Sequence, residues 1–458
     1  MTPTKEQRGI IDQATTGSSL AIRAFAGSAK TTTCLMVAEA LDNNALYVAF
    51  NKSIAVEASS KFPPSVTCKT CHSIAYAAIM TREYKSKLQG WLQASDVVSI
   101  GKLSFEKKLE VVTLTTAYCQ SAYESITTFA IEKADDLDIK EVDLDILSSY
   151  WKDLINPKSK AKISHDIYLK MFQLTQPMLG YDTIYLDEAQ DSNPVILDIV
   201  LRQKNAFKTQ LIIVGDDYQA IYAWRGAENA LASLGDGFTS LYLTESFRFT
   251  QEVADIAEKI ISKIGNTRHI TGNALYTTPF KTSATIVRTN ITLVQEILDA
   301  EEVGKKVKVL ADLKSLYPKL YHVEAILLGE VAKRPTKEFS QYKTKEALEI
   351  ASEELPELRR IINLVKLLWA RGGVEENIVK IKKASCPDAT HTITTAHKSK
   401  GLEWCEVTLT EDMFYPKGKE TNQHCLENNQ TGQLLYVAIT RGKFRVNLPS
   451  RVLELLED

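Results

Sequence analysis

The chain lacks any run of about eighteen apolar residues, so no membrane-spanning segment is expected. Its first residues, Met1 to Gln7, are polar and lack the apolar core of a secretion signal, and we therefore expect a cytoplasmic protein. An excess of charge is also lacking, because 57 acidic and 55 basic residues give a net charge of −2. No overall basic field indicates nucleic acid, although a neutral chain can still carry a local basic groove.

Cysteine is scarce, with seven residues spread over a chain of 458. This odd number indicates free thiols rather than a disulfide framework. Cys68 to His72 matches the C-x-x-C-H spacing of c-type haem attachment, but no axial ligand or second ligand pair is evident, so haem and zinc are both disfavoured. The composition, 44% hydrophobic and 24% charged, is that of a globular protein, and the length suggests about three or four domains.

The chain is organised around residues 24–31. A strand-forming run at 20–23 leads into this stretch, and a helix-forming run at 34–40 leads out of it. A strand, a turn of small residues and a helix that opens with Lys-Thr is the layout of a phosphate-binding loop, whose backbone N–H groups point at an anion. Lys30 would reach the β- and γ-phosphates of ATP, and the Thr31 hydroxyl would bind Mg²⁺.

Two alanines, Ala24 and Ala29, stand where this pattern has glycine. Alone, the stretch fits an ordinary strand–turn–helix with an exposed lysine equally well. Gln7 lies in a helix expected to end near Ala14. It is either a solvated residue or a residue that hydrogen-bonds to an adenine edge, since its amide both donates and accepts. The nucleotide contacts predicted here are Gln7, Ala26, Gly27, Ser28, Ala29, Lys30, Thr31 and Thr32.

A pair of carboxylates, Asp187 and Glu188, follows an apolar strand at 183–186. Adjacent acids are costly to place in a core, and metal and water chemistry explains them. Asp187 would hold Mg²⁺ and Glu188 would polarise the attacking water as a general base. The alternative is two exposed acids. After the next strand, at 211–214, Gln219 suits sensing of the γ-phosphate.

Polar and aromatic residues follow several other strands. Phe50 and Asn51 follow a strand at 45–50, where a nucleic-acid strand could stack and be held, although Phe50 could also be core. A strand at 66–69 likewise ends in polar residues. Tyr222 and Trp224 suit stacking on bases, worth roughly 1–3 kcal/mol each. The DNA contacts predicted in all are Phe50, Asn51, Thr70, His72, Tyr222, Trp224, Arg225 and His397.

The second half of the chain adds further candidates. Phe247 could stack on adenine and Arg248 could meet the γ-phosphate, although a plain strand with a surface arginine is the alternative. His397 could grip a backbone phosphate and Glu403 could accept from a ribose hydroxyl. Arg441 is a candidate arginine finger, a role worth about 10³–10⁵ in rate.

Two blocks, 85–175 and 296–383, have helical periodicity and many charges, and we interpret them as insertions. Neither has a catalytic signature. A basic run at 158–162 in the first block is interpreted as solvent-facing, with DNA binding as the alternative.

These motifs together resemble the UvrD/Rep/PcrA group of superfamily 1 DNA helicases. The resemblance is carried by residues 187–191, 215–227, 397–403 and 436–441, which follow the family's order. Residues 50–53 and 70–73 are most similar to the F-box DNA helicase branch, with no room here for an F-box.

The resemblance implies an α/β protein of two RecA-like parallel-sheet domains with ATP and Mg²⁺ in the cleft between them. Domain 1A would comprise 1–84 and 176–247, domain 2A would comprise 248–295 and 384–458, and the helical insertions 1B and 2B would be 85–175 and 296–383. Ala29 in place of glycine, Phe247 where tyrosine is usual, the non-acidic stretch 428–433 and the short second insertion depart from the family pattern.

The implied activity is an ATP-dependent helicase or translocase that moves 3′ to 5′ on single-stranded DNA and unwinds duplex. Its expected partners are single-stranded and partly duplex DNA and replication or repair proteins, and the expected state is a monomer. Three alternatives remain open: a DNA-stimulated ATPase that strips proteins with little unwinding, a DNA-binding module with poor turnover, and an enzyme that acts on RNA.

Overall fold

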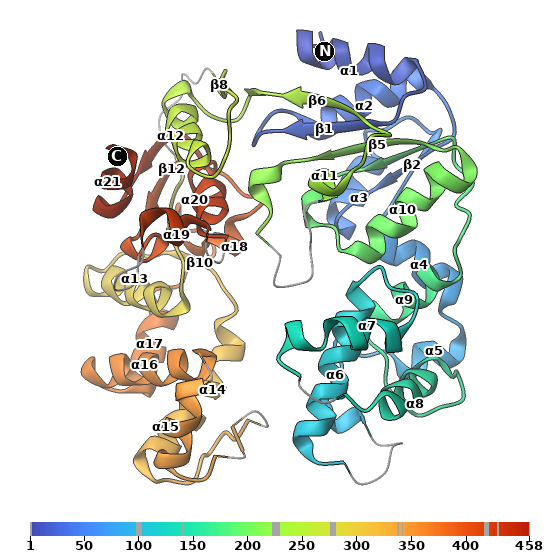
Figure 1. Ribbon diagram of the computed structural model, residues 1–458. Helices are drawn as coiled ribbons and strands as arrows, with labels where there is room; N and C mark the ends of the chain where they lie inside the picture. The colour runs from blue at the N-terminus through green and yellow to red at the C-terminus, as the bar shows by residue number, and fades with distance from the viewer. Residues whose placement is uncertain are drawn as a thin grey trace. The chain divides into compact units, whose positions relative to one another are not determined.

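The computed structural model describes residues 2–97, 103–139, 142–221, 230–274, 281–336, 339–340, 342–354, 356–415, 421–427 and 430–457. The chain divides into two compact units, Met1–Glu245 and Ser246–Asp458, and each is described by itself (Figure 1). Each unit contains a parallel sheet with helices, so the predicted α/β class is confirmed.

Unit 1 is built on a six-stranded sheet in the order β3-β2-β4-β5-β1-β6, in which every neighbouring pair is parallel. Central strands such as β4 are buried along their whole length, as expected of a sheet covered on both faces. In chain order the strands are β1 (Leu20–Ala24), β2 (Ala45–Val48), β3 (Val66–Lys69), β4 (Thr183–Leu186), β5 (Gln210–Gly215) and β6 (Thr239–Leu243).

Three of the helices that connect these strands, α3, α4 and α10, begin at polar caps. Asn51, Thr70 and Asn193 each accept a backbone N–H in the first turn of the helix that follows, which satisfies one of its unpaired donors. The helices are α1 (Lys5–Thr15), α2 (Lys30–Leu41), α3 (Lys52–Ser59), α4 (Cys71–Ile79), α10 (Pro194–Phe207) and α11 (Ala230–Ser233), with 3₁₀ turns η3 (Ala189–Asp191) and η4 (Asp217–Gln219).

A helical block lies between α4 and β4. Figure 1 shows α6, α7, α8 and α9 grouped at the end of unit 1 opposite α1. The lysines of the basic run at 158–162, Lys158, Lys160 and Lys162, are exposed. The block comprises α5 (Arg82–Lys87), η1 (Ala94–Asp96), α6 (Phe105–Gln120), α7 (Ile126–Lys133), η2 (Asp135–Leu137), α8 (Leu144–Ile155) and α9 (His165–Leu174).

Unit 2 is built on a five-stranded parallel sheet in the order β10-β11-β9-β12-β13. Its strands are β9 (Ser283–Val287), β10 (Lys308–Leu310), β11 (His391–Thr395), β12 (Trp404–Leu409) and β13 (Gly442–Asn447). In the described part of the range 296–383 there is therefore one strand, β10, which pairs with β11 at the edge of this sheet. A short pair, β7 (Glu245–Ser246) and β8 (Thr271–Gly272), stands apart from both sheets.

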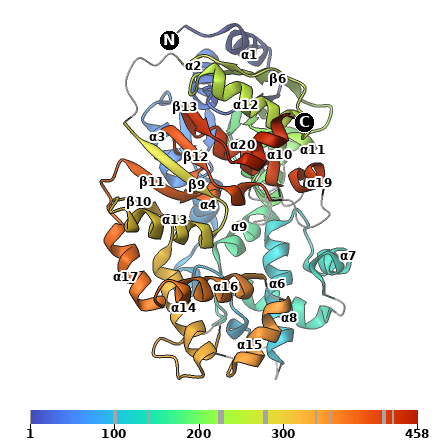
Figure 2. The same cartoon turned by 90° about the vertical axis from the view of Figure 1, so that its left-hand side faces the viewer.

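The helices of unit 2 fall into two groups. Figure 2 shows α14, α15 and α16 together on the far side of α13 from the sheet. The group that includes them is α13 (Asn290–Glu302), α14 (Leu313–Leu328), α15 (Lys345–Glu354), α16 (Pro356–Ala370) and α17 (Val374–Ala384). The others are α12 (Gln251–Ser262), α18 (Ala396–Ser399), α19 (Asn422–Glu427), α20 (Thr431–Ile439) and α21 (Ser450–Glu457), with η6 (Glu411–Met413). Among the described residues, no helix has the length and apolar character needed to cross a bilayer.

Candidate functional site

The turn between β1 and α2 has the geometry of an anion-binding loop. Gly27 has a φ of 75°, and Ala29, at φ 59° and ψ 40°, is the residue from which α2 starts. The first N–H groups of any helix lack acceptors within it, so the start of α2 is a ready anion site. Ser28 is buried, and its hydroxyl has no hydrogen-bond partner in the described part of the chain. A phosphate oxygen would satisfy this orphaned donor.

Ala29 occupies a left-handed conformation that favours glycine, because its Cβ crowds the following carbonyl at a cost of roughly 1–2 kcal/mol. We expect Ala29→Gly to raise the free energy of unfolding of unit 1 by about 1 kcal/mol. This gain corresponds to a melting temperature that is higher by about 2–4 °C. The matched control is Ala26→Gly, at a buried loop position outside the left-handed region, which should destabilise. Thermal melting monitored by circular dichroism measures both, and an unchanged or lower melting temperature for Ala29→Gly would contradict the strain.

Asp187 lies at the carboxyl end of β4, directly beside the loop. The Thr31 hydroxyl donates to its Oδ2 at 3.0 Å, the Tyr47 hydroxyl donates to the same oxygen, and the Glu188 N–H donates to Oδ1 at 2.8 Å. Burial, together with the neighbouring Glu188 charge, raises the pKa of Asp187. A carboxylate with a hydroxyl beside it, both facing one point, is a donor set that Mg²⁺ prefers.

Glu188 and Lys30 form an ion pair in which Lys30 Nζ lies 3.5 Å from Glu188 Oε1. The Lys30 side chain is only 10% exposed, which excludes the alternative of an ordinary turn with an exposed lysine. Asp187 is 3% exposed, which excludes the alternative that Asp187 and Glu188 are two exposed acids. Glu188 itself has a φ of 52°. Backbone in the left-handed region costs free energy at a non-glycine residue, so the surrounding structure holds this carboxylate in place.

A hydrogen-bonded chain links Glu188 to the end of β5. The Gln190 amide donates to Glu188 Oε2 at 2.5 Å, and its Oε1 accepts from the Asp216 N–H at 3.0 Å. Gln219 Nε2 donates to Asp216 Oδ2 at 2.6 Å. Burial raises the pKa of Asp216 to about 6. A Cβ at Gly215 would lie 2.5 Å from Gln190 Oε1, so glycine there lets Gln190 approach.

Gln7 is buried rather than solvated. Its side chain closes a capping box with Thr4 at the start of α1, and its Nε2 donates to Thr33 Oγ1 at 3.0 Å. Thr33 lies in the first turn of α2, beside Thr32. Gln7 therefore ties α1 to α2, and its contact with adenine stays a prediction.

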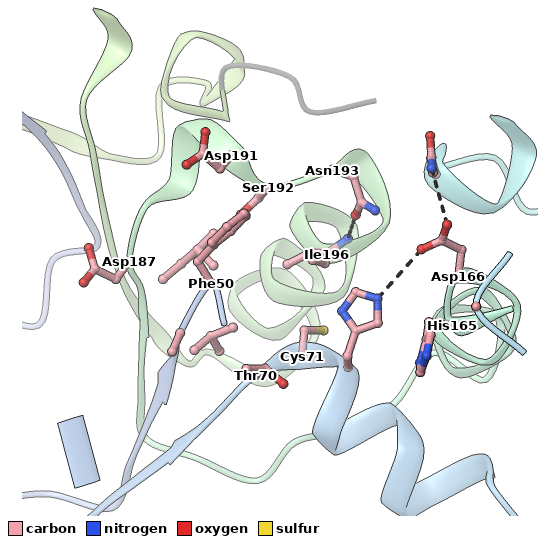
Figure 3. Close-up of a pocket in the computed structure, with 16 residues that line it drawn as sticks. Phe50, Thr70, Cys71, His165, Asp166, Asp187, Asp191, Ser192, Asn193 and Ile196 are labelled. Atoms are coloured by element: carbon pink, nitrogen blue, oxygen red, sulfur yellow. Dashed lines mark hydrogen bonds and ion pairs between the residues drawn. The ribbon is translucent and has the colours of Figure 1, made fainter. Parts of the chain in front are cut away.

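Three of the predicted DNA contacts, Phe50, Thr70 and His72, line one cavity of about 440 Å³ at the carboxyl ends of β2, β3 and β4 (Figure 3). Phe50 is 42% exposed, which excludes a core position. Asn51 is exposed and caps α3. Tyr222, Trp224 and Arg225 lie outside the described residues.

Two candidates of unit 2, Arg248 and Arg441, act on a third, Glu403. Arg248 Nε lies 3.2 Å from Glu403 Oε2, and Lys443 pairs with Oε1. Burial raises the pKa of Glu403, but the hydrogen bond from Lys443 and the Arg248, Lys443 and Arg441 charges outweigh it, and the pKa is lowered. Phe247 is 43% exposed, and His397 is half-buried in α18.

Arg441 is 1% exposed, and each nitrogen of its guanidinium donates within unit 2. Nε donates to Val437 O at 2.8 Å, Nη1 to Leu402 O at 3.4 Å and Nη2 to Thr440 Oγ1 at 3.2 Å. Arg248 Nη1 donates to Thr440 O at 3.4 Å, so both arginines contact the same residue. The structure thus brings together the two candidates that sequence analysis assigned to the γ-phosphate from this half of the chain.

Sequence analysis missed Tyr47, Gln190 and Lys443. Gln190 lies inside the motif at 187–191 and Lys443 lies two residues after the motif at 436–441, so both could have been found from those motifs. Tyr47 lies in an apolar strand, and nothing in its neighbourhood signals a carboxylate partner. All seven cysteines are free thiols, and no cluster of three or more metal-ligating side chains occurs within the described ranges, Cys68 to His72 included.

Comparison with known proteins finds one matching segment in each half of the chain. Residues 173–234 match the UvrD/REP helicase N-terminal domain, and residues 337–449 match the UvrD-like helicase C-terminal domain. The chain belongs to the UvrD-like helicase family. The first of these matches covers the Asp187–Gln219 segment, and the second covers Glu403 and Arg441 of this UvrD-like chain.

Two relatives that match nearly the whole of this chain are F-box DNA helicases. The chain is 29% identical to F-box DNA helicase protein 1 of Schizosaccharomyces pombe, over 99% of this chain and 58% of that protein. It is 30% identical to F-box DNA helicase 1 of Gallus gallus, over 96% of this chain and 48% of that protein. Gabija protein GajB of Bacillus cereus is 25% identical over 66% of this chain and 72% of its own length. This UvrD-like chain spans about half the length of the two F-box helicases.

Proposed function

We propose that the protein is an ATP-dependent DNA helicase or translocase that moves 3′ to 5′ on single-stranded DNA. The observation that carries the proposal is the convergence of Lys30, Thr31, Asp187 and Glu188 at the carboxyl ends of β1 and β4. Ligands of parallel α/β sheets bind at this edge. The orphaned Ser28 hydroxyl fits a triphosphate, and so does the start of α2, because the first N–H groups of a helix have no acceptor within that helix.

Within this site each side chain has a proposed task. Lys30 binds the β- and γ-phosphates, Thr31 and Asp187 hold Mg²⁺, and Glu188 takes a proton from the attacking water. Bound Mg²⁺–ATP supplies the phosphoanhydride and the charge neutralisation. Gln190 donates to one carboxylate oxygen of Glu188 and Lys30 pairs with the other, so Gln190 keeps the base in one orientation when Lys30 turns to phosphate. Gln219, through Asp216, belongs to the same hydrogen-bonded chain.

We also propose that each unit contains one RecA-like domain with one insertion. Domain 1A (1–84 and 176–247) and insertion 1B (85–175) then lie in unit 1, except for residues 246 and 247, and domain 2A (248–295 and 384–458) and insertion 2B (296–383) lie in unit 2. The parallel sheet of each unit, the helical block between α4 and β4 and the helices between β10 and β11 support this division, and β10 itself belongs to the sheet of unit 2. In this scheme Arg248 and Arg441 act on the γ-phosphate.

A second candidate function is a DNA-binding module with poor turnover, which the strained Ala29 favours. A third is a translocase that strips proteins with little unwinding. The deciding experiment measures ATP hydrolysis with and without single-stranded DNA, and strand displacement on duplexes with a 3′ or a 5′ tail. We expect DNA-stimulated hydrolysis and displacement from the 3′ tail. Hydrolysis without displacement supports the stripping translocase, and DNA binding without hydrolysis supports the binding module.

Tyr47 is proposed to position Asp187 for the metal. We expect Tyr47→Phe to raise the Mg²⁺ concentration for half-maximal ATP hydrolysis roughly tenfold, since loss of a ligand's hydrogen-bond partner weakens metal sites by about 10–100-fold. Tyr185→Phe is the matched control. Tyr185 faces Tyr47 on the paired strand β4, is equally buried, and its hydroxyl has no partner in the described residues. Equal Mg²⁺ requirements in the two variants would contradict the role.

A further inference from the structure

The cavity beside Phe50 joins two parts of unit 1. One wall comes from the strand ends, with Phe50, Thr70 and Asp187, and the other comes from the helical block, with Gln120, His165 and Asp166. Figure 3 shows Asp166 and Asp187 at opposite ends, with Phe50 between them. The helical block, which has no catalytic signature in the sequence, therefore contributes side chains to the candidate DNA-binding surface.

The lining of this cavity disfavours phosphate. It contains three carboxylates, Asp166, Asp187 and Asp191, and no lysine or arginine among its described residues. An anionic backbone group placed there would meet charges of its own sign. An uncharged planar ring that carries N–H donors suits the same lining, because it can stack on the exposed Phe50 ring and donate to a carboxylate. A nucleobase has these properties.

Asp166, at the start of α9, is the carboxylate best placed to accept from such a ring. Its Oδ2 accepts from Gln120 Nε2 at 3.4 Å, and its Oδ1 lies 3.8 Å from His72 Nε2. Both contacts are long, and each carboxylate oxygen has about two acceptor sites, so capacity for further hydrogen bonds remains. The Asp166 side chain is 30% exposed and thus accessible from the cavity.

We propose that Asp166 makes this pocket selective for DNA bases that carry an exocyclic amino group. The inference rests on the proposed function, since it assumes that a DNA strand reaches Phe50. Cytosine, adenine and guanine each present an amino donor to a carboxylate. Thymine and uracil present the O4 carbonyl in the corresponding place, which repels a carboxylate, and their N3–H donor lies between two carbonyl oxygens, so a carboxylate that approaches it meets both. The strand is held along its backbone elsewhere, and the pocket reads the edge of one base.

Cytosine and uracil provide the sharpest comparison, because they differ at one edge, where cytosine has the N4 amino group beside an acceptor N3 and uracil has the O4 carbonyl beside an N3–H. The experiment measures fluorescence anisotropy of labelled oligo(dC) and oligo(dU) of equal length at one fixed salt concentration, since affinity for nucleic acid depends on salt. The proteins are the full chain, Asp166→Asn and a control, Asp145→Asn. Asp145 is an exposed acid on α8 in the same helical block and does not line the cavity.

We expect the full chain to bind oligo(dC) roughly tenfold more tightly than oligo(dU), the gain from one hydrogen bond to a charged acceptor. Asp166→Asn should reduce the ratio to about one while oligo(dU) binding persists, and Asp145→Asn should keep the ratio. Asp166→Ser, which also removes the carboxylate, should reproduce the loss. Persistence of oligo(dU) binding shows that each variant is folded.

The outcomes separate this inference from the function on which it rests. Tight and equal binding of the two oligonucleotides by the full chain would overturn the selectivity and leave the helicase proposal standing. A preference that survives both Asp166 variants would overturn the assignment to Asp166. Absence of binding to either oligonucleotide would overturn the proposed function, and the inference with it.

Discussion

Glu188→Gln is expected to lower DNA-stimulated ATP hydrolysis by about 10²–10⁴-fold, the usual contribution of a general base. The amide retains the shape of the side chain and can still accept from Gln190, so nucleotide binding should persist. A steady-state hydrolysis assay and a fluorescent-nucleotide binding assay measure the two effects. The control is Glu39→Gln, an exposed acid on α2, the helix that carries Lys30.

A second variant, in the ion-pair partner of Glu188, tests whether the effect is on hydrolysis or on nucleotide binding. Lys30→Ala removes the cation that lies 3.5 Å from Glu188 Oε1 and should weaken nucleotide binding as well as hydrolysis. Glu188→Gln should lose hydrolysis and keep nucleotide binding, whereas Lys30→Ala should lose both. This result would separate the role of Glu188 in hydrolysis from the role of Lys30 in binding the nucleotide. DNA-stimulated hydrolysis retained in both variants would refute the site.

Arg441→Lys is expected to lower kcat for ATP hydrolysis by about 10³-fold or more, as removal of an arginine finger does. Lysine keeps the positive charge but loses the planar fork that binds phosphate through two N–H groups. Arg445→Lys, at an exposed position on β13, is the control and should leave kcat within about twofold, since surface substitutions rarely matter.

Arg441 is also buried and donates to the backbone of unit 2, so its substitution has a structural cost. A thermal melt of Arg441→Lys separates the two effects. A protein that stays folded at the assay temperature and yet loses hydrolysis supports the catalytic role. A folded variant with hydrolysis within tenfold of the unmodified chain would show that Arg441 serves only the fold.

Much of the sheet that carries the site was predictable, because its strands are short buried runs that end abruptly in polar residues. Residues 183–186 before Asp187 and 211–214 before Gly215 are of this kind, and both form strands in the predicted places. The parallel order brings such ends to one edge, so the proximity of Thr31 and Asp187 follows from local patterns and topology. The helix expected from Gln7 to near Ala14 is present as α1.

Other features depend on contacts that no local pattern encodes. Tyr47 has the sequence surroundings of a core residue, and only pairing of β2 with β4 brings its hydroxyl to Asp187. The strand β10 has three residues in a block of helical periodicity, too few to alter that pattern. The approach of Asp166 to His72 depends on how α9 packs against α4, which is a tertiary property.

The position of β1 has a consequence for how the protein is made. This strand, which leads into the phosphate loop, is hydrogen-bonded to β5 and β6, the last two strands of its sheet to be synthesised. Until β6 has been synthesised, the loop that follows β1 lacks the complete sheet that supports it. The helical block between α4 and β4 can already fold through its own local contacts. The earliest segment of the chain thus waits longest for its native neighbours, and truncated nascent chains should not retain nucleotide.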